Sequence, residues 1–306
     1  KSAIEVALAC EDYYNTGAKF LQEDISLEII NKLCEIHTNP KTKQIDFTIW
    51  FSQFMWMVKR HGIEIALNAL FFLSKISYEL LFETSLGDAD AGEEMLAVGI
   101  SNEESLQRML INNLCYSDII NLGFADDGWH KRPIFHCRNS QWKWEGTTSI
   151  VERIERNKVR KTVFDRRSGY EGLLRCKEYE ITALKSLNNK HFPKLLEIGD
   201  NWFDMEYCGE KLNEQNLPKD WDVQIDEILN ELNKANIIHR DIRPHNLMII
   251  NSVIKLIDFG WAVSYLHANS DIPKYLGDRW KCPDGFNDKY SIYKSIQSII
   301  TNSVIL

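Results

Sequence analysis

Two short segments of this sequence carry side chains suited to metal-assisted chemistry. Residues 239–246 read HRDIRPHN, and Asp258 opens a DFG triplet twelve residues after Asn246. Between them, 247–250 and 253–257 are apolar runs separated by Asn251-Ser252, which is typical of a β-hairpin. Such a hairpin would bring Asn246 and Asp258 to adjacent strand ends. Their amide and carboxylate oxygens are ligands of the kind that Mg²⁺ prefers.

The two segments resemble the catalytic loop H-R-D-x-x-x-x-N and the metal loop D-F-G of the protein-kinase fold family. In that family a carboxylate orients and deprotonates the acceptor hydroxyl, and oxygen ligands hold Mg²⁺ across the phosphates. The resemblance implies that Asp241 is the catalytic base and that Asn246 and Asp258 bind the metal. Arg243 stands where a catalytic cation that stabilises the phosphate is expected. The alternative is a chance HRD on the surface beside an unrelated DFG.

A lysine that binds ATP is expected upstream of these motifs. Val159-Arg160-Lys161 reads as a strand in which Val159 and Lys161 share a face. This resembles the family's V-x-K strand, whose lysine holds the α- and β-phosphates while the apolar residue covers the adenine. We therefore assign Lys161 and Val159 to ATP binding. Lys158 is the competing lysine, and a solvated basic strand is the alternative.

The partner of this lysine is expected on the helix predicted over 171–187. Glu180 has the family's spacing before a turn at His191-Phe192-Pro193, and Glu178 is the competing residue. Either glutamate could instead be an ordinary surface charge of the helix.

Residues 205–209 (MEYCG) resemble the hinge between kinase lobes, whose backbone bonds the adenine edge. Met205 would then be the gatekeeper, with Glu206 and Cys208 also at the ATP site; the alternative is a buried strand end. Further on, Cys282-Pro283-Asp284 takes the place of A-P-E. Asp288 resembles the acid that opens the helix anchoring the catalytic loop.

The sequence also departs from a regulated protein kinase. No G-x-G-x-x-G lies between Gly146 and Lys161, the segment 261–281 is short, and the sequence stops soon after the anchoring helix. These features point to compact kinases that act on small molecules or glycans. The HRD spelling disfavours aminoglycoside phosphotransferases, which usually have H-G-D.

Helices and strands that could position these residues fall into two groups. In residues 1–138, strand-like runs at 46–51 and 78–82 alternate with helical patterns at 62–75 and 102–114, and a hairpin at 119–124 and 133–137 closes the group. This alternation predicts an α/β domain with a mostly parallel sheet. A junction at 139–146 precedes an α+β, compact kinase-like domain over 147–306, with a small lobe at 147–208 and a large lobe at 209–306.

Residues 1–138 resemble a class I, Rossmann-like S-adenosylmethionine methyltransferase that lacks its first strand and Gly-rich loop. The resemblance assigns Asp24 to the adenine amino group and Glu5 to the ribose hydroxyls; ordinary loop acids are the alternative. Lys59, Arg60 and His61 would lie at the substrate mouth and hold an anionic acceptor, unless they are a solvated helix start.

The fusion resembles the bifunctional bacterial enzymes that terminate lipopolysaccharide O-antigen chains. This resemblance implies phosphorylation of the terminal sugar of the glycan and methylation of that phosphate, with ATP, Mg²⁺ and S-adenosylmethionine as cofactors. A glycosyltransferase or polymerase is the implied partner. Two other hypotheses are a protein kinase with a docking module and a catalytically inactive scaffold.

Composition agrees with a folded protein of a reducing compartment. The 306 residues carry a net charge of −8, which removes the electrostatic reason to expect nucleic acid. Seven cysteines without a C-x-x-C pair fit a cytoplasmic location, including the inner face of the cell membrane. The most apolar stretch, 63–73, is too short to span a bilayer, and peripheral membrane association remains an option. Because the sequence starts at Lys1, we expect residues upstream of it.

Overall fold

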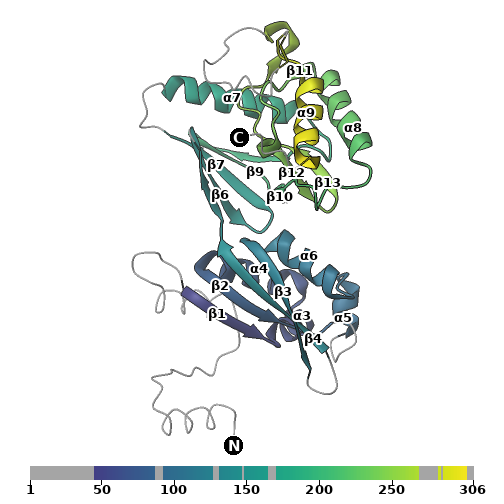
Figure 1. Ribbon diagram of the computed structural model, residues 1–306. Coiled ribbons are helices and arrows are strands. Elements are labelled where there is room, and N and C mark those ends of the chain that lie inside the picture. The colour runs from purple at the N-terminus through teal and green to yellow at the C-terminus, as the bar shows by residue number, and fades with distance from the viewer. Residues whose placement is uncertain are drawn as a thin grey trace, which may run out of the picture. The chain divides into compact units, whose positions relative to one another are not determined.

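The computed structural model describes residues 45–86, 92–126, 131–146, 148–164, 170–268, 282–283 and 285–301. The chain divides into two compact units, one comprising Lys1–Gln107 and Cys115–Ser140, the other Arg108–Leu114 and Gln141–Leu306. Figure 1 labels their elements. Among the described residues, no helix is long and apolar enough to cross a membrane.

In its described part, the first unit contains a four-stranded sheet in the order β1-β2-β4-β3. β1 and β2 are parallel, whereas β4 is antiparallel to both β2 and β3. The predicted closing hairpin is present, and it is longer than the apolar runs indicated because polar residues continue the pairing. The strands are β1 (Ile45–Phe51), β2 (Ser77–Glu83), β3 (Tyr116–Asp126) and β4 (Lys131–Ser140).

Helices of the first unit bury the apolar side chains of one sheet face. The Phe54 ring of α3 meets Phe82 of β2 edge-on, with centroids 5.7 Å apart, and Leu80 and Phe135 are fully buried. Alternate strand residues share a face, so these side chains form one apolar layer. The helices are α3 (Gln53–His61), α4 (Ile63–Ile76) and α5 (Gly92–Ala97); α6 (Glu103–Asn113) begins in this unit, and its residues from Arg108 onward belong to the second.

Helix α3 was not predicted. Lys59, Arg60 and His61 form its exposed last turn, rather than a helix start. Positive charge is favoured at a helix C-terminus because the backbone carbonyls there carry partial negative charge. The three basic residues therefore have a structural reason for their position.

The second unit begins with an antiparallel sheet, five-stranded over the residues that are described, in the order β5-β6-β7-β9-β8. Its first strand lies inside the segment 139–146 predicted as a junction, where Trp144 pairs with Val151. Helix α7 (Tyr170–Ser186) connects β7 to β8. The strands are β5 (Lys143–Glu145), β6 (Ser149–Glu155), β7 (Lys158–Val163), β8 (Leu195–Ile198) and β9 (Trp202–Glu206).

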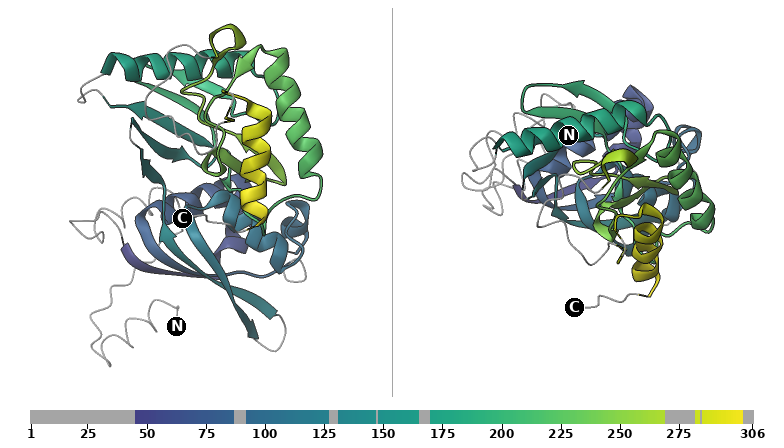
Figure 2. Two further views of the ribbon diagram at one scale, coloured as in Figure 1. Left: turned by 45° about the horizontal axis from the view of Figure 1, so that its top comes forward. Right: turned by 90° about the horizontal axis from the view of Figure 1, so that it is seen from above.

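Two long helices and several short elements complete the second unit. The helices α8 (Trp221–Lys234) and α9 (Asp288–Ile300) run side by side (Figures 1 and 2), and Trp221 contacts Tyr293 edge-on. The short elements are β10 (Glu210–Lys211), β11 (Ile237–Ile238), η1 (Pro244–Asn246), β12 (Leu247–Ile250), β13 (Val253–Leu256), β14 (Val263–Ser264) and η2 (Tyr265–His267).

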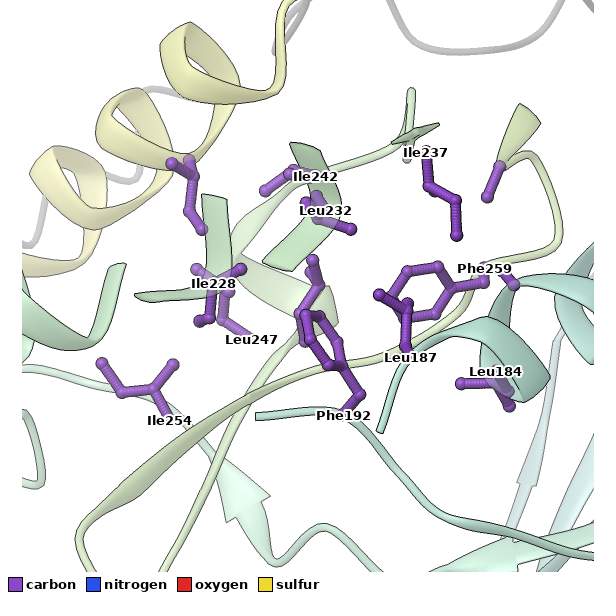
Figure 3. Packing of buried hydrophobic residues seen from close by; sticks show 14 of the residues in the cluster. Leu184, Leu187, Phe192, Ile228, Leu232, Ile237, Ile242, Leu247, Ile254 and Phe259 are labelled. Carbon is purple, nitrogen blue, oxygen red and sulfur yellow. The ribbon is translucent and has the colours of Figure 1, made fainter. Parts of the chain in front are cut away.

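Phe259 is part of the hydrophobic core of the second unit, where it lies near Leu187 (Figure 3). This ring is fully buried, packs edge-on against Phe192 at 5.8 Å and contacts the His239 ring at 4.6 Å. Burying a phenylalanine contributes roughly 1.5–3 kcal/mol. The backbone of the DFG segment is therefore fixed by the core.

Candidate active site

The HRDIRPHN segment forms a loop between β11 and β12, and the loop is closed by Asn246. Its Nδ2 donates to the backbone oxygen of Asp241 at 2.8 Å and to Oδ2 at 3.3 Å. Nε of Arg243 lies 3.6 Å from the same Oδ2, on a side chain that is 45% exposed. Burial raises the pKa of Asp241, while Arg243 partly opposes the shift. Asp241 is therefore a stronger base than a fully solvated aspartate.

Asp288 holds the start of this loop through both of its carboxylate oxygens. Its Oδ2 accepts from the backbone N–H of His239 at 2.7 Å, and its Oδ1 accepts from that of Arg240 at 3.2 Å. Burial raises the pKa of Asp288 to about 6, although the two N–H groups favour the charged form. Arg240 has a φ of 68°, and such a left-handed conformation persists only where the surroundings enforce it.

His239 is held as a neutral imidazole. Its Nε2 lies 3.1 Å from the backbone oxygen of Ile257, and its Nδ1 accepts from the backbone N–H of Asp241 at 3.3 Å. Because the carbonyl can only accept, the proton resides on Nε2. Burial lowers the pKa of His239 to about 4. The histidine is thus a scaffold that links the two motif loops.

The predicted hairpin between the motifs is confirmed. Strands β12 and β13 pair antiparallel, and the turn residues Asn251 and Ser252 have φ values of 50° and 63°. Two positive φ values mark a type I′ turn, whose twist matches that of a hairpin. The N–H of Ile257 donates to the backbone oxygen of Asn246 at 3.0 Å. The hairpin thereby places the two proposed metal ligands at neighbouring positions.

Lys161 binds the carboxylates of both Glu180 and Asp258. Its Nζ lies 2.6 Å from Oε2 of Glu180 and 2.7 Å from Oδ1 of Asp258. Burial lowers the pKa of Lys161, but the two carboxylates outweigh it and raise that pKa, so the ammonium stays charged. The Lys161 charge in turn lowers the pKa of Asp258. The result is a fixed positive charge next to the DFG carboxylate.

The competing residues lie elsewhere. Lys158, the first residue of β7, points to Glu155, with Nζ and Oε1 2.6 Å apart. Glu178 is exposed, two residues from Glu180 on α7. Among the four candidates, Lys161 and Glu180 are the two that meet.

The hinge segment, 205–209, begins with the last two residues of β9. Val159 of β7 pairs with Met205 of β9, and both are 6% exposed. Oε2 of Glu206 accepts from Nζ of Lys255 at 3.0 Å, so this side chain is committed to an ion pair. Burial raises the pKa of the Cys208 thiol to about 12. Cys208 therefore stays protonated and contributes an apolar surface.

Gly209 ends the hinge at a position that only glycine fits. Its φ is +83°, and a Cβ there would lie 2.0 Å from the backbone oxygen of Ile249. The backbone of the hinge thus lies directly against the backbone of β12. This contact fixes where the chain leaves the five-stranded sheet.

The donor set fits Mg²⁺ bound together with ATP. Asn246 and Asp258 offer amide and carboxylate oxygens, the hard ligands that Mg²⁺ takes. In the part of the chain that is described, no group of three or more His, Cys, Asp or Glu side chains could hold a metal ion. Phosphate oxygens and water must therefore complete any Mg²⁺ coordination at this site.

The residues assigned to S-adenosylmethionine, Asp24 and Glu5, lie outside the described residues, as does Asp284. Sequence reasoning also missed two buried lysines near the site. Lys255 neutralises Glu206, and Lys177 bonds two backbone carbonyls. No sequence signal could have found them, because lysine in a strand or helix usually lies at the surface.

The motif region is similar to one protein family. Residues 178–285 match the family model described as "Protein kinase domain". Aurora kinase of Saccharomyces cerevisiae is 52% identical over 48 residues, covering 15% of this chain and 13% of that protein. Cyclin-dependent kinase F-4 of Oryza sativa subsp. japonica is 32% identical over 120 residues, covering 33% and 25%. The chain thus spans a quarter or less of these relatives.

Solved structures with similarity include a crystal structure of WbdD, 16% identical, with a TM-score of 0.36, covering 98% of this chain and 80% of that one. Another, of the bifunctional kinase-methyltransferase WbdD, is 17% identical, with a TM-score of 0.33, covering 77% of this chain and 59% of that one. Similarity at these TM-scores supports no assignment by itself. The family match and the assembled motif loops together show that the chain contains a protein-kinase-like domain.

Proposed function

We propose that this chain transfers the γ-phosphoryl group of Mg-ATP to a hydroxyl of the terminal sugar of a bacterial O-antigen glycan. Methylation of the new phosphate would follow and terminate chain elongation. The observation that carries the phosphotransferase proposal is the position of Lys161, which contacts both Glu180 and Asp258. Lysine bound to a helix glutamate, beside the DFG aspartate, is the arrangement that phosphoryl transfer by kinases requires.

In the proposed reaction, Asp241 accepts the proton of the acceptor hydroxyl. The hydroxyl oxygen forms a bond to the γ-phosphorus while the bond from that phosphorus to the bridging oxygen breaks, and ADP leaves. Lys161 would hold the α- and β-phosphates, and Arg243 would face the transferred group. Asn246 and Asp258 would hold Mg²⁺, which would neutralise part of the phosphate charge.

The glycan acceptor and the methylation step rest on the resemblance to O-antigen chain terminators. The methylation step is supported by the α/β sheet of the first unit, whose parallel pair β1–β2 is followed by an antiparallel hairpin. The cytoplasmic location at the inner membrane face and a glycosyltransferase or polymerase partner are part of this proposal. The residues that would hold S-adenosylmethionine lie outside the described residues, so methylation stays a prediction.

A protein kinase is the second candidate. It is favoured by the family match, which is to a protein kinase domain, and by the curated relatives, which are named as protein kinases. On this alternative, the first unit would be a docking module and the acceptor a serine or threonine hydroxyl.

Incubation with γ-labelled ATP separates the candidates. We expect label on a mannose-type oligosaccharide, none on a generic protein substrate, and none on either with Asp241→Asn. Label on protein alone would favour the protein kinase, and no transfer to any acceptor would indicate a scaffold. Transfer retained at the wild-type rate in Asp241→Asn would contradict the assignment of the base. Addition of methyl-labelled S-adenosylmethionine after phosphorylation tests the second step, which we expect to require the phosphate.

A further inference from the structure

Helix α7 carries a lysine that is buried on its inner side. Lys177 is 8% exposed, and its Nζ donates to the backbone oxygens of Gly199 at 2.5 Å and Asp200 at 2.6 Å. A lysine so deeply buried is unusual, because its ammonium must replace its hydration by bonds to the protein. Here two carbonyls of the turn between β8 and β9 replace water.

The turn that receives Lys177 is itself rigidly built. The N–H of Gly199 donates to the oxygen of Trp202 at 2.9 Å, and a Cβ on Gly199 would lie 2.2 Å from the Trp202 ring. The guanidinium of Arg160 covers Trp202 at 3.7 Å and also binds Asp204 at 2.7 Å and 2.9 Å. Both carbonyls are therefore presented from a fixed position.

The same turn is tied to the strand that carries Lys161. The N–H of Val163, two residues after Lys161 on β7, donates to the oxygen of Asn201 at 2.8 Å. On the helix, Lys177 precedes Glu180 by three residues, about 4.5 Å along the axis, on nearly the same side. Strand β7 and helix α7 are thus joined twice, once through Lys161–Glu180 and once through the turn and Lys177.

We propose that Lys177 is a positioning residue that holds α7 where Glu180 can bind Lys161, so that the ion pair forms without a regulatory partner. This inference rests on the proposed phosphotransferase function and extends it to how the site is kept assembled. Lys177 touches neither nucleotide nor acceptor. It acts only through the position of Glu180.

A double-mutant cycle tests this role. Lys177→Met should lower kcat/KM for ATP by about tenfold to a hundredfold, because small displacements in an active site have effects of this size. In the Glu180→Gln background the same change should add less than about twofold, since the contact it supports is already lost. Lys177→Arg, which keeps donors for both carbonyls, should restore most of the activity. Lys185→Met, on the exposed end of the same helix, is the matched control.

An equal loss of kcat/KM in both backgrounds would overturn the proposal, since Lys177 would then act on stability alone. Wild-type kinetics for Lys177→Met would overturn it as well. If Lys177→Met does not fold, Lys177→Gln keeps one amide donor, and the same non-additivity is expected of it. Failure of the proposed function is distinguishable: the wild type would transfer no phosphate. The cycle is then measured as Mg-ATP affinity by calorimetry, where Lys177→Met should weaken binding only when Glu180 is present.

Discussion

Lys161 and Glu180 form an ion pair with Nζ and Oε2 2.6 Å apart, and their side chains are only 11% and 2% exposed. Removing Lys161 leaves the buried Glu180 charge without compensation, which costs about 3–5 kcal/mol. The pair therefore connects strand β7 to helix α7, and it also positions the lysine that is proposed to bind the phosphates of ATP.

Lys161→Met should consequently reduce kcat by roughly 10²–10³, the loss typical of a missing group that stabilises transition-state charge. Lys158→Met, on the same strand, should leave kcat within about twofold, because Lys158 binds the exposed Glu155. Steady-state kinetics with both variants checks this assignment. Equal losses in the two would contradict it.

The acidic limb of the pH–rate profile should report Asp241. Because burial raises the pKa of this carboxyl, kcat/KM should fall on acidification with an apparent pKa above 3.8. Arg243 opposes that shift, so Arg243→Gln should move the limb to still higher pH, whatever its effect on the maximal rate. A limb unmoved in Arg243→Gln would exclude Asp241 as the group that titrates.

Asp288 should make stability depend on pH between about 4 and 6. Its pKa is about 6 in the folded protein against 3.8 ordinarily, so the folded state binds more protons in this window. Stability from Asp288 is then full below pH 3.8 and decreases as pH rises through 6. The wild type's advantage in unfolding free energy over Asp288→Asn should accordingly be largest near pH 4. Denaturant unfolding at several pH values measures it, and an advantage that grows with pH would refute the burial of this carboxyl.

Gly209→Ala should displace the hinge. The added Cβ would overlap the backbone oxygen of Ile249, which cannot move without breaking the β10–β12 pairing. We expect KM for ATP to rise at least about tenfold and stability to fall by roughly 1–3 kcal/mol. Gly172→Ala is the control, because nothing lies within 4 Å of its Cβ in helix α7. That variant should be neutral or more stable by up to about 1 kcal/mol.

Some of the site could be predicted because spacing constrains it. A hairpin of defined length separates Asn246 from Asp258, and a period of two sets Val159 and Lys161 on one face of β7. Glu178 and Glu180 could not be separated, since residues two apart point about 200° apart on a helix and only tertiary packing shows which side is inner.

Other elements escaped prediction for physical reasons. Helix α3 has only nine residues and begins two residues after β1 ends, so it is shorter than the roughly 11–18 residues over which helical periodicity is read. Strand β5 has only three residues, and its pairing with β6 is a tertiary event. Lys177 carries no local signal, because the carbonyls that receive it lie more than twenty residues away.

The tautomer of His239 has a consequence for reading kinetic data. Its Nε2 proton is donated to the Ile257 carbonyl and its pKa is about 4, so this imidazole stays uncharged through the neutral pH range. Any inflection in activity near or above pH 6 must therefore originate outside the motif histidine, and the candidates are Asp288, whose pKa is about 6, and the γ-phosphate of ATP, whose last proton leaves at about pH 6.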